Sequence, residues 1–156
     1  MSHQVREQLG DFSSIVCLKS IIAGMEDALG EKATAIALIA AGRARGKNLA
    51  ESLSSMKPST SLEDVADRMA IALGKDGTRL LVIDKIVQEG EVIKVYTKET
   101  VCSAGEPLGS ARKCTFSLGT VWGALEQLLG ERLQGKHTES VLRGNTHDVF
   151  EFTKRS

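Results

Sequence analysis

Aromatic residues are scarce in this chain: Phe, Trp and Tyr make up 4% of its 156 residues. The interior must therefore be built from Leu, Ile, Val and Ala, and such a core can be solid or can enclose a long apolar ligand. A surplus of charge is also lacking, because 20 basic residues balance 20 acidic ones. Non-specific nucleic-acid binding requires a basic surface, so we expect no nucleic-acid partner.

Cysteine is sparse as well, with only Cys17, Cys102 and Cys114 at wide spacing. An odd number of cysteines at such spacing fits neither a disulfide framework nor a CxxC metal motif, so reduced thiols in a cytoplasmic protein are the expectation. The longest apolar run, residues 35–41, is far too short for a transmembrane segment, and the N-terminal MSHQVREQLGDFSS lacks the apolar core of a signal peptide. We therefore expect a soluble, cytoplasmic protein.

Signatures of catalysis are missing too. The chain contains no GxSxG elbow, no dinucleotide-binding glycine fingerprint and no HExxH motif. Residues 42–47 (GRARGK) come closest to a phosphate-binding loop, but the glycine spacing is one residue short, Asn48 replaces the hydroxyl residue and no strand precedes it. We expect no enzymatic activity and no cofactor.

What is present in the first half of the chain, residues 11–74, is the apolar spacing of three helices. Asp11 is a candidate N-cap of the first helix and Gly30 its end. The second helix, residues 31–53, is apolar on all sides in its early part, which predicts burial between other elements, and Pro58 follows it. Ser61 and Asp64 offer a capping box for a third helix. The apolar face of this helix is formed by Leu62, Val65, Met69 and Leu73.

The second half, residues 79–154, changes to the alternation of strands. It predicts a hairpin of residues 79–87 and 91–97, a loop over 102–113, a helix over 117–129 ended by Gly130, and a closing hairpin of residues 132–142 and 147–153. The loop is long for a compact domain, and whether it forms a lid stays open. Tight turns between consecutive strands predict one α+β domain over residues 1–156, with a helical layer packed on a four-stranded antiparallel sheet.

The C-terminal segment of residues 114–152 resembles the signature of the 4-vinyl-reductase-like, hydrocarbon-binding domain family. That signature contains a cysteine, a helix with glycines, a Glu-Cys pair, a glycine turn and a Cys-x-Phe motif. The matching positions are Cys114, Gly119, Gly123, Glu139, Gly144 and Phe150. Gly42 and Gly46 resemble the paired glycines that these domains carry before a Leu-Ala stretch. The resemblance implies the fold of TRAPP-type vesicle-transport subunits, a homodimer, and an apolar pocket for a hydrocarbon, acyl or tetrapyrrole-related ligand.

The chain departs from that family at two positions, because Ser140 and Asp148 stand where many members have cysteine. Three cysteines would suit zinc or redox chemistry, whereas Cys114 with a serine and an aspartate is a poor site for a soft metal. Asp148 shares a strand face with phenylalanines, where a carboxylate is costly unless it is paired, so a place at the strand edge is the simpler assumption. His137 and Glu139 share one strand face, with His147 across the turn. They are either a metal or proton-transfer group or, with fewer assumptions, exposed polar residues, and we expect no metal.

These patterns predict a non-catalytic binding protein for a hydrophobic small molecule. The predicted ligand-binding residues are Phe12, Val16, Leu38, Gly42, Gly46, Phe116, Trp122 and Leu125. Arg43, Arg45 and Lys47 would hold an anionic head group or form a solvated helix face. For the two glycines, helix packing is the favoured interpretation and a groove floor the functional alternative. For Trp122, the core is favoured and a pocket wall is the alternative. Two rival functions are a ligand-free, TRAPP-like interaction or assembly scaffold and an accessory subunit acting on a tetrapyrrole.

Overall fold

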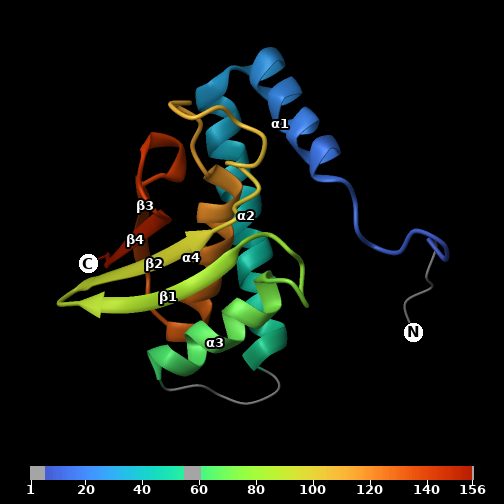
Figure 1. Cartoon of the computed structure of the whole chain (residues 1–156). Coiled ribbons are helices and arrows are strands. Elements are labelled where there is room, and N and C mark those ends of the chain that lie inside the picture. Colours follow the sequence, from blue (N-terminus) through green and yellow to red (C-terminus); the bar gives the residue numbers. More distant parts are fainter. Residues whose placement is uncertain (1–5, 55–60, 156) are drawn as a thin grey trace.

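The structure, a computed structural model, describes residues 6–54 and 61–155 (Figure 1). The order of its elements is three helices, a hairpin, one helix and a second hairpin, as predicted. The elements are α1 (Ile15–Leu29), α2 (Glu31–Ser54), α3 (Leu62–Leu73), β1 (Val82–Glu89), β2 (Val92–Lys98), α4 (Thr115–Leu129), β3 (Leu133–Glu139), the 3-10 turn η1 (Val141–Arg143) and β4 (Asp148–Lys154).

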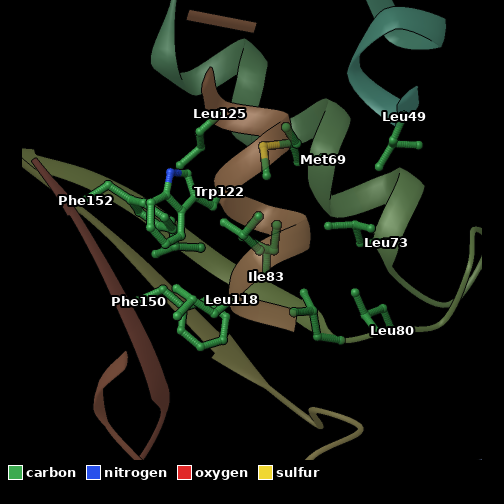
Figure 2. Close-up of a cluster of buried hydrophobic side chains, with 14 of the residues drawn as sticks. Leu49, Met69, Leu73, Leu80, Ile83, Leu118, Trp122, Leu125, Phe150 and Phe152 are labelled. Atoms are coloured by element: carbon green, nitrogen blue, oxygen red, sulfur yellow. The ribbon is translucent and has the colours of Figure 1, made fainter. Parts of the chain in front are cut away.

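The four strands form one antiparallel sheet in the order β1-β2-β4-β3. The predicted α+β class with a four-stranded antiparallel sheet is confirmed. On β4, Phe150 and Phe152 are fully buried, and they face the helices α3 and α4 across the core (Figure 2). On β2 the buried residues Ile93, Val95 and Thr97 alternate with partly exposed ones, which is the pattern of a strand with one covered face.

Helix ends follow local capping chemistry. Ser14 Oγ accepts a hydrogen bond of 3.1 Å from the Val16 amide, so α1 begins at Ile15 and the predicted cap Asp11 is wrong. Both residue types cap helices well, and only Ser14 lies next to the first helical turn. Gly30 ends α1 with a positive φ of 85°, as predicted. Ser61 Oγ accepts from the Asp64 amide and begins α3, as predicted, whereas the predicted break at residues 56–60 lies outside the described residues.

The helices α2 and α4 are packed backbone against backbone. A Cβ atom on Gly46 would lie 2.7 Å from the Ala124 nitrogen, and one on Gly42 would lie 2.9 Å from the Thr120 nitrogen. On the α4 side, Gly119 and Gly123 meet the backbone of α2 in the same way. Four glycines therefore allow an approach that any larger side chain would prevent.

Only one side of α2 is covered. The prediction that its early part is buried between other elements is wrong, because Ile36 is 63% exposed. The physical reason is the course of α1, which joins α2 at Gly30 and then diverges from it toward its own N-terminus (Figure 1). No helix among the described residues is both long enough and apolar enough to cross a bilayer.

Candidate functional site

The layer between the sheet and the helices is filled by side chains. Trp122 packs edge-to-face against Phe152 with ring centroids 6.3 Å apart, and its indole nitrogen donates a 3.0 Å hydrogen bond to the Leu133 carbonyl. Leu125 is fully buried beside them (Figure 2). Trp122 and Leu125, predicted as ligand-binding residues, thus lie in the packed core.

An open groove of about 560 Å³ lies where α1 diverges from the rest of the molecule. We call it the α1 groove. Its floor includes Leu73 and Leu80, which belong to the core cluster and lie at the end of that cluster away from Phe150 in Figure 2. Its other apolar lining residues are Phe12, Ile15, Leu18, Ile21, Val101 and Phe116, and its polar ones are Asp11, Ser13, Ser14, Cys17, Arg45, Thr78, Arg79 and Thr120.

Of the predicted ligand-binding residues, the structure brings only Phe12 and Phe116 together in this groove. Val16 is 69% exposed and is not among the lining residues, because it lies on the outer side of α1. Leu38 lines a second open groove between α1, α2 and the loop of residues 102–113. Gly42 and Gly46 lie against α4, which is the helix-packing interpretation of their spacing.

Two arginines supply positive charge at the α1 groove. The guanidinium of Arg79 lies 5.5 Å from the centroid of the Phe12 ring, and its Nε donates to the Lys75 carbonyl. Arg45 forms no ion pair within the described ranges and lines the groove. Arg43, in contrast, pairs with Glu126 at 2.7 Å, so it is not available for a head group. The groove therefore combines apolar walls with two arginines and one carboxylate, that of Asp11.

Sequence reasoning missed Ile21, Leu73, Leu80 and Val101 as groove residues. Each of them carries only the ordinary signal of an apolar side chain in a helix or beside a strand. Their proximity depends on how α1 is placed relative to the segments after α3 and β2, and no spacing in the sequence encodes that placement.

A disulfide links Cys102 to Cys114, with the two Cα atoms 5.2 Å apart. The expectation of three reduced thiols is therefore wrong for this pair, and only Cys17 is a free cysteine among the described residues. The two cysteines are 12 positions apart at the ends of the long loop, and the fold brings the end of the β2 region next to the start of α4. Spacing alone gave no indication of this contact.

A buried polar cluster lies beside the disulfide and centres on Asp148, which is fully buried. Its carboxylate accepts hydrogen bonds from Thr100 Oγ1 at 2.8 Å and from the Val141 amide at 3.3 Å, and it lies 3.2 Å from His137 Nε2. The Cys114 amide donates to His137 Nδ1 at 3.5 Å, and the other ring nitrogen, Nε2, faces the carboxylate. Burial by itself would raise the pKa of Asp148, but these hydrogen bonds outweigh it and hold the pKa below its ordinary value.

The donor atoms of Cys114, His137 and Asp148 lie within 4.8 Å of one another, at the place where the family resemblance suggests soft-metal chemistry. In the disulfide state these residues do not fit a metal ion. The Cys114 sulfur is bonded to Cys102 and offers no thiolate, and both imidazole nitrogens already have partners. Ser140, the other departure from the family, accepts from the Leu142 amide and caps the turn η1.

The remaining polar candidates do not join this cluster. The predicted shared face of His137 and Glu139 is wrong, because a register shift between them in the β3–β4 pairing turns Glu139 toward solvent. His147 instead pairs with the exposed Asp84 at 2.8 Å. The three side chains therefore cannot act on one substrate atom.

Comparison with known proteins identifies the fold alone. No family model matches the chain, and no curated protein matches it either. The phenol-responsive sensory domain of the transcription activator PoxR, solved with phenol, is similar over 92% of this chain and 76% of that chain, with 14% identity and a TM-score of 0.72. A trafficking protein particle complex subunit 3 from Naegleria fowleri, covalently bound to palmitic acid, is similar over 91% of this chain and 93% of that chain, with 14% identity and a TM-score of 0.60. The predicted TRAPP-like fold is confirmed.

Proposed function

We propose that this protein binds a hydrophobic small molecule in the α1 groove and is a binding protein, not an enzyme. One observation carries the proposal: Phe12, Ile15 and Ile21 line the groove and yet are 59%, 43% and 60% exposed. Removing such surface from water stabilises a complex by about 25 cal/mol per Å². The groove volume of about 560 Å³ falls in the range of ordinary ligand sites.

The two similar structures support the ligand class. One is a sensory domain solved with phenol and the other is bound to palmitic acid, so this fold accommodates both a small aromatic and a long acyl ligand in other proteins. Arg45 and Arg79 at the margin favour a ligand that carries a carboxylate or another anionic group besides its apolar part. A cytoplasmic location and a homodimer belong to the same proposal.

A titration with the fluorescent fatty acid cis-parinaric acid tests this function. We expect saturable binding that Ile21→Ser weakens about tenfold, because the complex then loses part of a buried aliphatic side chain. Val16→Ser is the matched control, since Val16 lies on the same helix at 69% exposure but does not line the groove. Equal affinities for the two variants, or no saturable binding to the wild-type protein, would refute the proposed site.

A TRAPP-like scaffold without a ligand is the second candidate function. It is favoured by apolar side chains that stay exposed away from the groove, namely Ile36 on α2 and Ile71 on α3, at 63% and 69%. Native mass spectrometry of the purified protein separates the two functions. A co-purifying lipid or fatty acid supports ligand binding, whereas a bare protein that also ignores the fluorescent probe supports the scaffold.

A further inference from the structure

The helix α1 is attached to the molecule by polar contacts with the loop of residues 102–113. None of its residues is buried. Lys19 of α1 donates hydrogen bonds of 3.0 Å and 2.9 Å to the carbonyls of Cys102 and Ala104, and it pairs with Glu106. These three acceptors all lie in the first part of the loop, so the position of α1 depends on the shape of that segment.

A second contact involves the other end of the loop. Arg112 pairs with Glu26 of α1 at 2.9 Å, and it also pairs with Glu106 within the loop. The four charged side chains of this network are 18–24% exposed, so they are partly buried. Lys19 and Glu26 thus bind α1 to both ends of one loop.

The disulfide closes that loop. Cys102 lies in the turn that follows β2, and Cys114 is the N-cap residue of α4. The carbonyl of Cys102 is itself one of the acceptors for Lys19. Breaking the sulfur–sulfur bond releases the constraint that holds the two ends of the loop together, and it does so directly at the contact with α1.

We propose that the Cys102–Cys114 pair is a reducible dithiol site whose oxidised form latches α1 against the molecule and so sets the affinity of the α1 groove. The second part of this inference rests on the proposed ligand-binding function, while the first part does not. Where the protein meets a reducing thiol pool, thiol–disulfide exchange opens such a pair.

The reaction that opens the latch is thiol–disulfide exchange with a small dithiol. Cys102 lines a narrow crevice and is 9% exposed, whereas Cys114 is 2% exposed, so the attacking thiolate bonds to the Cys102 sulfur. The sulfur–sulfur bond breaks and the Cys114 sulfur leaves as a thiolate. It takes up from solvent the proton that the attacking thiol released, because a second anion is unfavourable next to the buried Asp148 carboxylate. The second thiol of the reductant then displaces Cys102, so two electrons and two protons pass to the protein and the reductant becomes a disulfide.

Hydrogen exchange of the wild-type protein, with and without dithiothreitol, tests the latch independently of any ligand. We expect the amides of α1 to exchange at least about fivefold faster after reduction, while those of α3, which packs on β1, keep their rates. Unchanged exchange in α1, or an equal increase in α1 and α3, would overturn the latch.

Two variants show whether the loop contacts transmit the effect. Lys19→Gln removes the contacts to Cys102, Ala104 and Glu106 without touching the disulfide, so α1 should exchange rapidly in both redox states and reduction should add little. Cys17→Ser is the control for the remaining thiol. Cys17 lines the α1 groove but is outside the pair, so without ligand this variant should respond to reduction as the wild type does. A full redox response in Lys19→Gln would contradict the proposal.

Titration of the oxidised and reduced protein with cis-parinaric acid tests the second part. We expect the affinity to change by about fivefold or more on reduction. Equal affinity in the two states would overturn the control of the groove and leave the proposed function intact. No binding in either state would refute the proposed function, while hydrogen exchange would still decide whether the latch exists.

Discussion

The helices α1 and α4 are equal in length, at 15 residues each, and similarly rich in apolar residues, yet they are used in opposite ways. Nine residues of α4 are buried and none of α1 is. The composition of a helix therefore does not decide its burial. Position decides it: α4 lies between the sheet and α2, while α1 joins α2 at Gly30, makes polar contacts with the loop of residues 102–113 and diverges from α2 (Figure 1).

The two helices differ in how closely the rest of the protein approaches their glycines. In α4, Gly119 and Gly123 lie directly against the backbone of α2, and Gly42 and Gly46 of α2 lie in the same way against the backbone of α4. In α1, a methyl group added to Gly24 would have no atom of the rest of the protein within 4 Å, so nothing approaches this position. Small residues in α4 allow close packing, whereas the aliphatic side chains of α1 remain available to a ligand.

The largest expected effect on stability comes from substituting a glycine of the α2–α4 contact, with a glycine of α1 for comparison. Gly46→Ala places a methyl group 2.7 Å from the backbone nitrogen of Ala124 and should lower the free energy of unfolding by about 3 kcal/mol. Gly24→Ala, the matched change on α1, should raise it by about 0.5–1 kcal/mol because alanine favours the helix. Urea unfolding followed by circular dichroism measures both. A similar loss in the two variants would show that α1 is packed as tightly as α4.

The next effect concerns the polar cluster around the buried Asp148, which adjoins the start of α4 at Cys114. Asp148→Asn replaces the carboxylate by an amide, whose NH2 group cannot accept the hydrogen bonds that the carboxylate oxygens now accept. The free energy of unfolding should therefore fall by about 2 kcal/mol. Asp84→Asn is the control, since Asp84 also pairs with a histidine but is exposed, and we expect no measurable change. Equal losses in urea unfolding would mean that burial does not distinguish the two pairs.

The pH dependence of this difference follows from the lowered pKa of Asp148. A carboxylate with a folded-state pKa below its unfolded-state pKa contributes its full stability above the unfolded value, near pH 4, and loses it as the pH falls through the lower folded value. The difference in unfolding free energy between wild type and Asp148→Asn should be constant from about pH 7 to pH 5 and should shrink below about pH 4. A difference that vanishes near pH 6 would contradict the cause given for the shift.

The smallest expected effect on global stability comes from the contacts of α1. Glu26→Gln removes the ion pair with Arg112 and should change the unfolding free energy by less than about 1 kcal/mol, because the pair is partly solvated. Local exchange of α1 should nevertheless accelerate. Asp27→Asn, an exposed neighbour with no ion pair in the described part of the chain, should change neither quantity. A large global loss in Glu26→Gln would place α1 in the cooperative core.

The parts of the fold that could be predicted are those that depend on neighbouring residues in the sequence. The bounds of α2, the end of α4 at Gly130 and the cap of α3 at Ser61 follow from periodicity and capping within a few residues. Asp148 was expected at the strand edge, because a carboxylate among phenylalanines is costly unless it is paired. That expectation is wrong, since Asp148 is fully buried and is paired with His137 and Thr100.

The candidate site was less predictable because it depends on contacts between distant segments. Phe12 and Phe116 were selected as ligand-binding residues, but their neighbours in the groove, such as Leu80, come from a segment that only tertiary structure places there. The pairing of Cys102 with Cys114 depends in the same way on the approach of the β2 end to the start of α4. Neither contact can be predicted from the hydrophobic periodicity of the sequence.

Nuclear magnetic resonance of the side-chain methyl groups, in the presence of a spin-labelled stearic acid, tests binding in the α1 groove directly. We expect strong broadening of Ile21, Leu73 and Leu80, which line the groove, while the core residues Val95 and Leu125 keep their line widths. Broadening of Val95 and Leu125 with unaffected groove residues would contradict it, because the ligand would then occupy the interior between sheet and helices.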